Sequence, residues 1–199
     1  MNGNNQGNNN QNSNIGNSNI GNANNQPNIQ INLAMNLVQV VPGRKPIYTC
    51  PGDPTILVKV SDSESLAEEM RVQSKAYAAL QNDQHFSGRY NPCPRVISYL
   101  EQNGKYYLIM KKIDGQTIAD RYGEEPNSVP NHIWEQIHLI VYVLFYHNIH
   151  YIDVSSYNFL VDNNDRVYII DFGHAKEIVV DDFLKDCLVN TKAWNPMNG

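Results

Sequence analysis

Two carboxylates and one carboxamide stand out in the stretch "YIDVSSYNFLVDNNDRVYIIDFGHAKEI". Asp153 and Asn158 are five residues apart in a short polar loop, and Asp171 directly follows the apolar run "VYII". The segment "FLVDNNDRVYII" predicts a hairpin. Closing that hairpin brings Asn158, before its first strand, close to Asp171, after its second. Such oxygen ligands suit Mg²⁺, so two of the groups can hold metal while the third accepts a proton.

Strands and helices must position this loop, and their signals follow one another along the chain. We expect strands at 36–41, 45–50 and 55–60, a helix within 61–80, a hairpin of 94–102 and 106–113, a helix at 131–146, a hairpin at 158–170 and a last helix around 182–189. Ser61 and Glu64 predict a capping box for the first helix. This order predicts an α+β fold in two layers of unlike composition.

The motifs resemble those of the protein kinase superfamily. "DVSSYN" followed by "YIIDFG" resembles its catalytic loop and its metal-binding DFG motif. Upstream, Lys59 in "ILVKV" resembles the family's third-strand Lys. "YYLIMKKIDG" resembles the strand and hinge beside adenine, with Met110 as the gatekeeper. The resemblance covers roughly residues 38–176 and implies a protein kinase-like two-lobe fold.

The resemblance also implies a reaction and its cofactors, ATP and Mg²⁺. Asp153 would accept or orient the proton of a substrate hydroxyl, on a protein or on a small molecule. Asn158 and Asp171 would hold Mg²⁺, and Lys59 would polarise the non-transferred phosphates.

The partner of Lys59 stays open at this point. The family's first helix carries a Glu that pairs with this Lys, and the matching position here is Gln73. Gln73 can hydrogen-bond Lys59 but carries no charge. Glu69, one turn earlier, reaches Lys59 if the helix shifts; the other interpretation of Glu69 is a solvated flank of the helix.

Several family features are missing. No GxGxxG precedes Lys59, Tyr151 and Ile152 replace the usual His-Arg, and Ser155 replaces the Lys of Ser/Thr kinases. Only 28 residues follow Asp171, without an APE motif, so we expect a shortened C-terminal lobe. Three hypotheses remain: a minimal Ser/Thr protein kinase, a pseudokinase that serves as a nucleotide-binding or interaction scaffold, and a small-molecule kinase of the aminoglycoside or choline type.

The first 30 residues differ in composition from the rest. Half of residues 1–28 are Asn, and no charged residue precedes Arg44. Such a segment can bury little apolar surface, so we expect a disordered tail at 1–30. The domain is then 31–199, with an N-lobe at about 31–112 and a C-lobe at about 113–199. The Asn-rich start resembles proteins of AT-rich amoebal or giant-virus genomes.

Composition also restricts the partners and the compartment. The net charge of −5, without basic clusters, argues against nucleic acid. The most apolar segment, 137–146, is about half as long as a membrane span needs, so no membrane partner is expected. Three cysteines without zinc-site spacing indicate reduced thiols in the cytoplasm, or the host cytoplasm of a virus. The oligomeric state stays open.

Overall fold

The structure is a computed structural model that describes residues 37–41, 43, 45–178 and 192–195. The tail expected at 1–30 and the helix expected around 182–189 lie outside these residues, as does Cys187. The expected domain boundaries therefore stay predictions. Cys50 and Cys93 are free thiols. No helix in the described part of the chain is long and apolar enough to cross a membrane.

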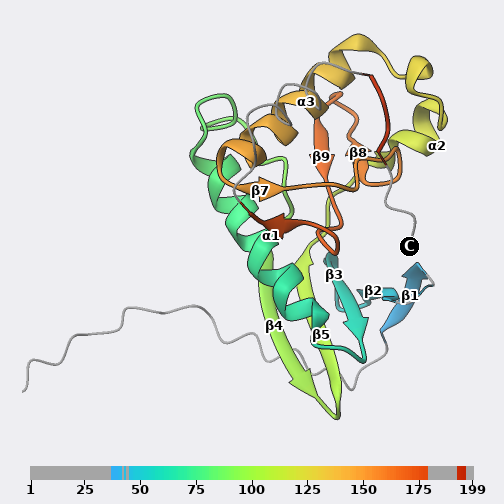
Figure 1. The fold of residues 1–199 in the computed structure, drawn as a ribbon. Helices are drawn as coiled ribbons and strands as arrows, with labels where there is room; N and C mark the ends of the chain where they lie inside the picture. The colour runs from blue at the N-terminus through green and yellow to red at the C-terminus, as the bar shows by residue number, and fades with distance from the viewer. Residues whose placement is uncertain (1–36, 42, 44, 179–191, 196–199) are drawn as a thin grey trace, which may run out of the picture. The chain divides into compact units, whose positions relative to one another are not determined.

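An antiparallel five-stranded sheet forms the first layer, in the order β1-β2-β3-β5-β4 (Figure 1). Its strands are β1 (Val38–Val41), β2 (Ile47–Cys50), β3 (Asp53–Ser61), β4 (Val96–Gln102) and β5 (Lys105–Lys111). The expected turn between β4 and β5 is confirmed, because Asn103 and Gly104 both adopt positive φ angles, 54° and 71°. These strands place Lys59 in the middle strand of the sheet.

Helix α1 (Ser65–Asn82) lies beside β4 and β5 and also contacts α3 (Figure 1). Its apolar positions recur at helical spacing, so that Leu66, Val72 and Ala76 are fully buried. The expected capping box is wrong: Ser61 ends β3 and is itself buried, and Glu64 at the helix start makes no side-chain cap bond. The helix starts later because β3 continues through Ser61, which pairs with Tyr106.

The second half of the described chain is built around α3 (Asn131–Tyr146), whose apolar side chains enter the main core. The other elements are short: β6 (Gln116–Thr117), α2 (Ile118–Tyr122), the 3₁₀ turn η1 (Pro126–Ser128), β7 (Ile149–His150), β8 (Phe159–Val161), β9 (Val167–Ile169) and β10 (Lys176–Glu177). They form a three-stranded sheet, β6-β8-β9, and a two-stranded one, β10-β7.

The hairpin β8–β9 brings its two ends together as expected. Phe159 pairs with Ile169, and the Ile170 amide donates to the Asn158 carbonyl at 2.9 Å. The loop that contains Asn158 and the residue that precedes Asp171 are therefore fixed side by side by backbone hydrogen bonds.

Candidate active site

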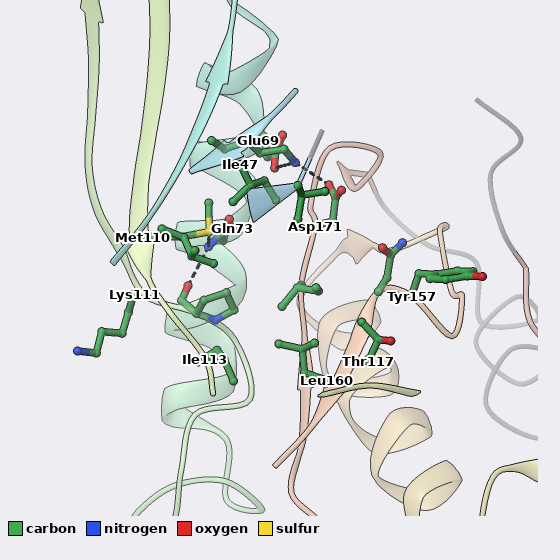
Figure 2. Close-up of a pocket in the computed structure, with 16 residues that line it drawn as sticks. Ile47, Glu69, Gln73, Met110, Lys111, Ile113, Thr117, Tyr157, Leu160 and Asp171 are labelled. Carbon is green, nitrogen blue, oxygen red and sulfur yellow. Dashed lines mark hydrogen bonds and ion pairs between the residues drawn. The ribbon is translucent and has the colours of Figure 1, made fainter. Parts of the chain in front are cut away.

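A cavity of about 340 Å³ lies between the sheet and the hairpin β8–β9. Figure 2 shows Met110 and Gln73 on one side of it and Leu160, Thr117 and Asp171 on the other. Most of the lining surface is apolar, and the charged side chains of Lys59, Glu69 and Asp171 together form its polar end. The lining residues up to the end of β5 are Val41, Ile47, Leu57, Lys59, Glu69, Gln73, Pro94, Met110 and Lys111, and those after it are Ile113, Thr117, Tyr157, Asn158, Leu160, Ile170 and Asp171.

Lys59 is held by two carboxylates at the polar end of the cavity. Its Nζ lies 2.6 Å from Glu69 Oε1 and 2.9 Å from Asp171 Oδ1. The side chains of Lys59 and Glu69 are only 5% and 2% exposed, whereas that of Asp171 is 46% exposed. The buried pair is thus fixed inside the fold, and Asp171 presents its carboxylate to the cavity.

The charges of this cluster stabilise one another. Burial alone would lower the pKa of Lys59, but the carboxylates of Glu69 and Asp171 raise it above its ordinary value. Burial would likewise raise the pKa of Asp171, but the charge and the hydrogen bond of Lys59 outweigh it and lower that pKa. Lys59 is therefore a cation and Asp171 an anion at neutral pH.

Glu69, and not Gln73, is the partner of Lys59. Gln73 Nε2 donates to the Pro94 carbonyl at 2.9 Å and contacts Met110 Sδ at 3.8 Å. The interpretation of Glu69 as a solvated flank is also wrong, since its residue exposure is 3%. Glu69 and Gln73 lie one turn apart on the same face of α1, so each faces a different part of the cavity wall.

Asp171 is locked in place by its neighbours. Its φ angle of 59° is in the left-handed region, which is strained for an L residue other than glycine. The Gly173 amide donates to Asp171 Oδ1 at 3.0 Å, and Phe172 is buried in the core against the ring of Tyr151, at a centroid distance of 5.5 Å. The Tyr151 hydroxyl donates to the Ile170 carbonyl at 2.6 Å. Tyr151, where the family usually has His, thus anchors the residue before Asp171.

Asp153 and Asn158 lie on the loop next to Asp171. Asn158 Nδ2 donates to the Asp153 carbonyl at 3.0 Å, which ties the two ends of the motif together. Asp153 Oδ2 lies 3.5 Å from His174 Nδ1. Asn158 lines the cavity, whereas Asp153 is not among the lining residues and its carboxylate lies beside His174.

The residues present fit a Mg²⁺ ion. Asn158 and Asp171 both line the cavity and carry the hard oxygen donors that this ion prefers. Within the described residues, no group of three or more His, Cys, Asp and Glu side chains is arranged to hold a metal. A two-ligand protein site suits Mg²⁺, because the ion usually completes its shell with water and substrate phosphates.

Sequence reasoning missed Lys45, a charged residue that contacts the site through Glu69. Its Nζ lies 3.2 Å from Glu69 Oε2, on the other oxygen of the carboxylate that holds Lys59. Lys45 lies in the turn between β1 and β2, and no spacing links it to the motifs. The signal that could have found it is that Lys45 and Arg44 are the only charged residues before β3.

A family model described as the protein kinase domain matches residues 58–196, more than half of the chain. The chain belongs to the protein kinase family. A search of curated protein sequences found no match. Solved structures similar to this kinase domain include WbdD in co-crystals with the kinase inhibitor LY294002, with a TM-score of 0.53 and 18% identity over 74% of this chain and 34% of that one. They also include the PK-1 kinase of Cydia pomonella granulovirus, with a TM-score of 0.51 and 18% identity over 71% of this chain and 52% of that one.

These comparisons and the described elements confirm the expected fold class. The kinase domain has a sheet-rich N-lobe and, within this chain, a small C-lobe around α3. The chain spans about a third of the WbdD chain and about half of the PK-1 chain. At 18% identity these two structures show the fold, and the activity is argued next from the site.

Proposed function

We propose that this kinase domain transfers the γ-phosphoryl group of ATP to a serine or threonine hydroxyl in a Mg²⁺-dependent reaction. One observation carries the proposal. The buried ammonium of Lys59 is fixed between Glu69 and Asp171 at the polar end of a mostly apolar cavity. The apolar faces of a planar aromatic base fit the apolar part, and a polyphosphate would then reach the polar end.

Each polar residue has a role in this proposal. Lys59 binds the non-transferred phosphates, and Glu69 holds its ammonium in position. Asn158 and Asp171 hold Mg²⁺, which neutralises phosphate charge when it is bound. Asp153, on the same loop as Asn158, accepts or orients the proton of the incoming hydroxyl.

A scaffold that binds nucleotide without turnover is the second candidate. Ser155 favours it, because this position carries a phosphate-facing Lys in Ser/Thr kinases, whereas here it is a short, buried side chain. The scaffold and the enzyme share Lys59, Asn158 and Asp171. They differ at Asp153, which has a role only in the chemical step. For the enzyme, we also propose that the substrate is a protein and that the reaction takes place in the cytoplasm.

A thermal-shift titration with ATP, with and without Mg²⁺, tests the binding step that both candidates share. A ligand that binds only the folded state raises the melting temperature by mass action. We expect Mg²⁺ with ATP to stabilise the wild type, and Asp171→Asn to lose the Mg²⁺-dependent part of that shift while it stays folded. No shift in the wild type at millimolar ATP would contradict both candidates. An equal Mg²⁺-dependent shift in Asp171→Asn would contradict the metal assignment.

A further inference from the structure

The turn between β1 and β2 can offer few backbone donors to a phosphate. Its sequence is "PGRKP", and Pro42 and Pro46 have no amide hydrogen. A glycine-rich turn in this place would surround the phosphate tail with several amides. If this domain binds ATP, another group has to provide part of that stabilisation.

Lys45 is placed to provide it. Its Nζ lies 3.2 Å from Glu69 Oε2, while Lys59 takes the other oxygen of the same carboxylate at 2.6 Å. One buried carboxylate therefore holds two ammonium groups side by side. The side chain of Lys45 is 26% exposed, against 5% for Lys59, so Lys45 is the more accessible of the two cations.

The side chains of Lys45 and Asp171 both end close to Gly173. A Cβ atom at Gly173 would lie 3.4 Å from Lys45 Nζ and 3.1 Å from Asp171 Oδ1. The ammonium of Lys45 therefore reaches across from the turn to the DFG segment. Its partner Glu69 lines the polar end of the cavity, where the phosphates of a nucleotide would lie.

We propose that Lys45 binds the phosphate tail of the nucleotide, as a side-chain substitute for the backbone amides of a glycine-rich turn. The inference rests on the proposed function and extends it to a residue outside the motifs. The ammonium of Lys45 is partly exposed, and Lys59 remains bound to Glu69, so Lys45 can leave Glu69 for a phosphate without leaving a buried charge unpaired. Charge-assisted bonds to phosphate are roughly twice as strong as neutral ones, and Glu69 keeps Lys59 when Lys45 moves.

The test compares affinities for adenosine, ADP and ATP with Mg²⁺ by calorimetry. The variants are Lys45→Met, Lys45→Arg and a control, Lys105→Met. Lys105 is an exposed residue at the start of β5, and its Nζ lies 3.7 Å from Asp62 Oδ1. We expect Lys45→Met to weaken ATP binding about tenfold, which corresponds to about 1.4 kcal/mol. Adenosine affinity should not change, Lys45→Arg should retain most of the ATP affinity, and Lys105→Met should match the wild type.

A double-mutant cycle separates phosphate binding from a merely positional role. If Lys45 only holds Glu69 in place, its substitution has no further effect once Glu69 is Gln. If Lys45 binds phosphate, Lys45→Met still weakens ATP binding about tenfold in the Glu69→Gln background. Equal ATP affinity of wild type and Lys45→Met, or an equal loss for adenosine and ATP, would overturn the inference and leave the proposed function standing. A wild type that binds no ATP would overturn both.

Discussion

The carboxylate of Glu69 organises the charged end of the cavity. It accepts from Lys59 at 2.6 Å and from Lys45 at 3.2 Å, and it is nearly inaccessible to water. A buried ion pair is costly to break from one side, because the remaining charge is left without compensation. The position of Lys59 therefore depends on α1, the helix that carries Glu69.

Substitution on α1 distinguishes its two buried polar residues. We expect Glu69→Gln to weaken Mg²⁺-dependent ATP binding, because Lys59 then keeps only Asp171 as a charged partner. Gln73→Leu should lower the free energy of unfolding by about 1–3 kcal/mol, since the Pro94 carbonyl loses the Gln73 donor. It should leave the ATP-induced shift close to that of the wild type. Denaturant unfolding and thermal shift measure the two effects, and the reverse pattern would mean that Gln73 is the functional partner.

The pKa shifts of Asp171 and Lys59 predict how stability depends on pH. The pKa of Asp171 is lower in the folded state, so its contribution to the free energy of unfolding is present above its ordinary pKa of about 3.9 and is lost as pH falls further. The pKa of Lys59 is raised, so its contribution is present below about 10.4 and is lost as pH rises through its folded-state value. In EDTA, the free energy of unfolding of Asp171→Asn should fall less steeply than that of the wild type as the pH drops below about 4. If the free energy of unfolding of both proteins falls equally with pH in this range, the coupling of Asp171 to Lys59 is contradicted.

At the residue scale, local motifs were predictable and long-range pairings were not. Asp153, Asn158 and Asp171 are close in sequence, and one hairpin fixes their arrangement. Glu69 and Lys59 meet only after α1 docks on the sheet, and the helix phase decides whether Glu69 or Gln73 faces the ammonium. Lys45 carries no spacing signal at all, because it enters the site from a turn.

At the scale of elements, α1 is joined to the segment that follows the DFG motif. Arg71 and Lys75 on α1 both form ion pairs with Glu177 of β10, and β10 pairs with β7 directly before the catalytic loop. The helix that carries Glu69 is thus tied to the C-lobe without a phosphate. In other protein kinases the Arg before the catalytic Asp commonly binds a phosphate on the activation loop. This chain has Ile152 at that position.

Glu177→Gln should loosen α1 while the protein stays folded. We expect faster amide hydrogen exchange in α1 and a weaker ATP-induced thermal shift than in the wild type, both most evident at low salt, because exposed ion pairs are screened by salt. Glu68→Gln is a matched control, since Glu68 pairs with Arg71 within α1 itself. If both variants exchange like the wild type, Glu177 does not hold the helix.

The long elements were predictable because a periodic pattern of apolar residues can be recognised only over many residues. The helix at 131–146 and the β4–β5 hairpin have the expected positions. The two-residue strands β6, β7 and β10 are too short for any periodic pattern and form only because the tertiary fold brings their partners near. The start of α1 was misplaced for a related reason: pairing with β5 keeps Ser61 in β3, and local capping preference does not outweigh it.

At the scale of the whole molecule, residues 1–30 are predicted to be dispensable. They are rich in Asn and poor in apolar and charged side chains, so they can contribute little to a core. A protein that starts at residue 31 should have nearly the same melting temperature and the same ATP-induced shift as the full chain. A large fall in the melting temperature would show that the segment packs on the domain and would move the predicted boundary.

Phosphoryl transfer by the wild type and by Asp153→Asn is the most direct test of the account. Incorporation of labelled γ-phosphate into the protein itself and into a generic basic protein should be followed over long incubations, since Ser155 provides no ammonium for the transferred group. Asn is nearly isosteric with Asp, so the loop and ATP binding should survive the substitution. We predict slow incorporation by the wild type and none by Asp153→Asn or by a Lys59→Ala control. Equal incorporation by wild type and Asp153→Asn, or none by either while ATP still binds, would contradict the enzyme.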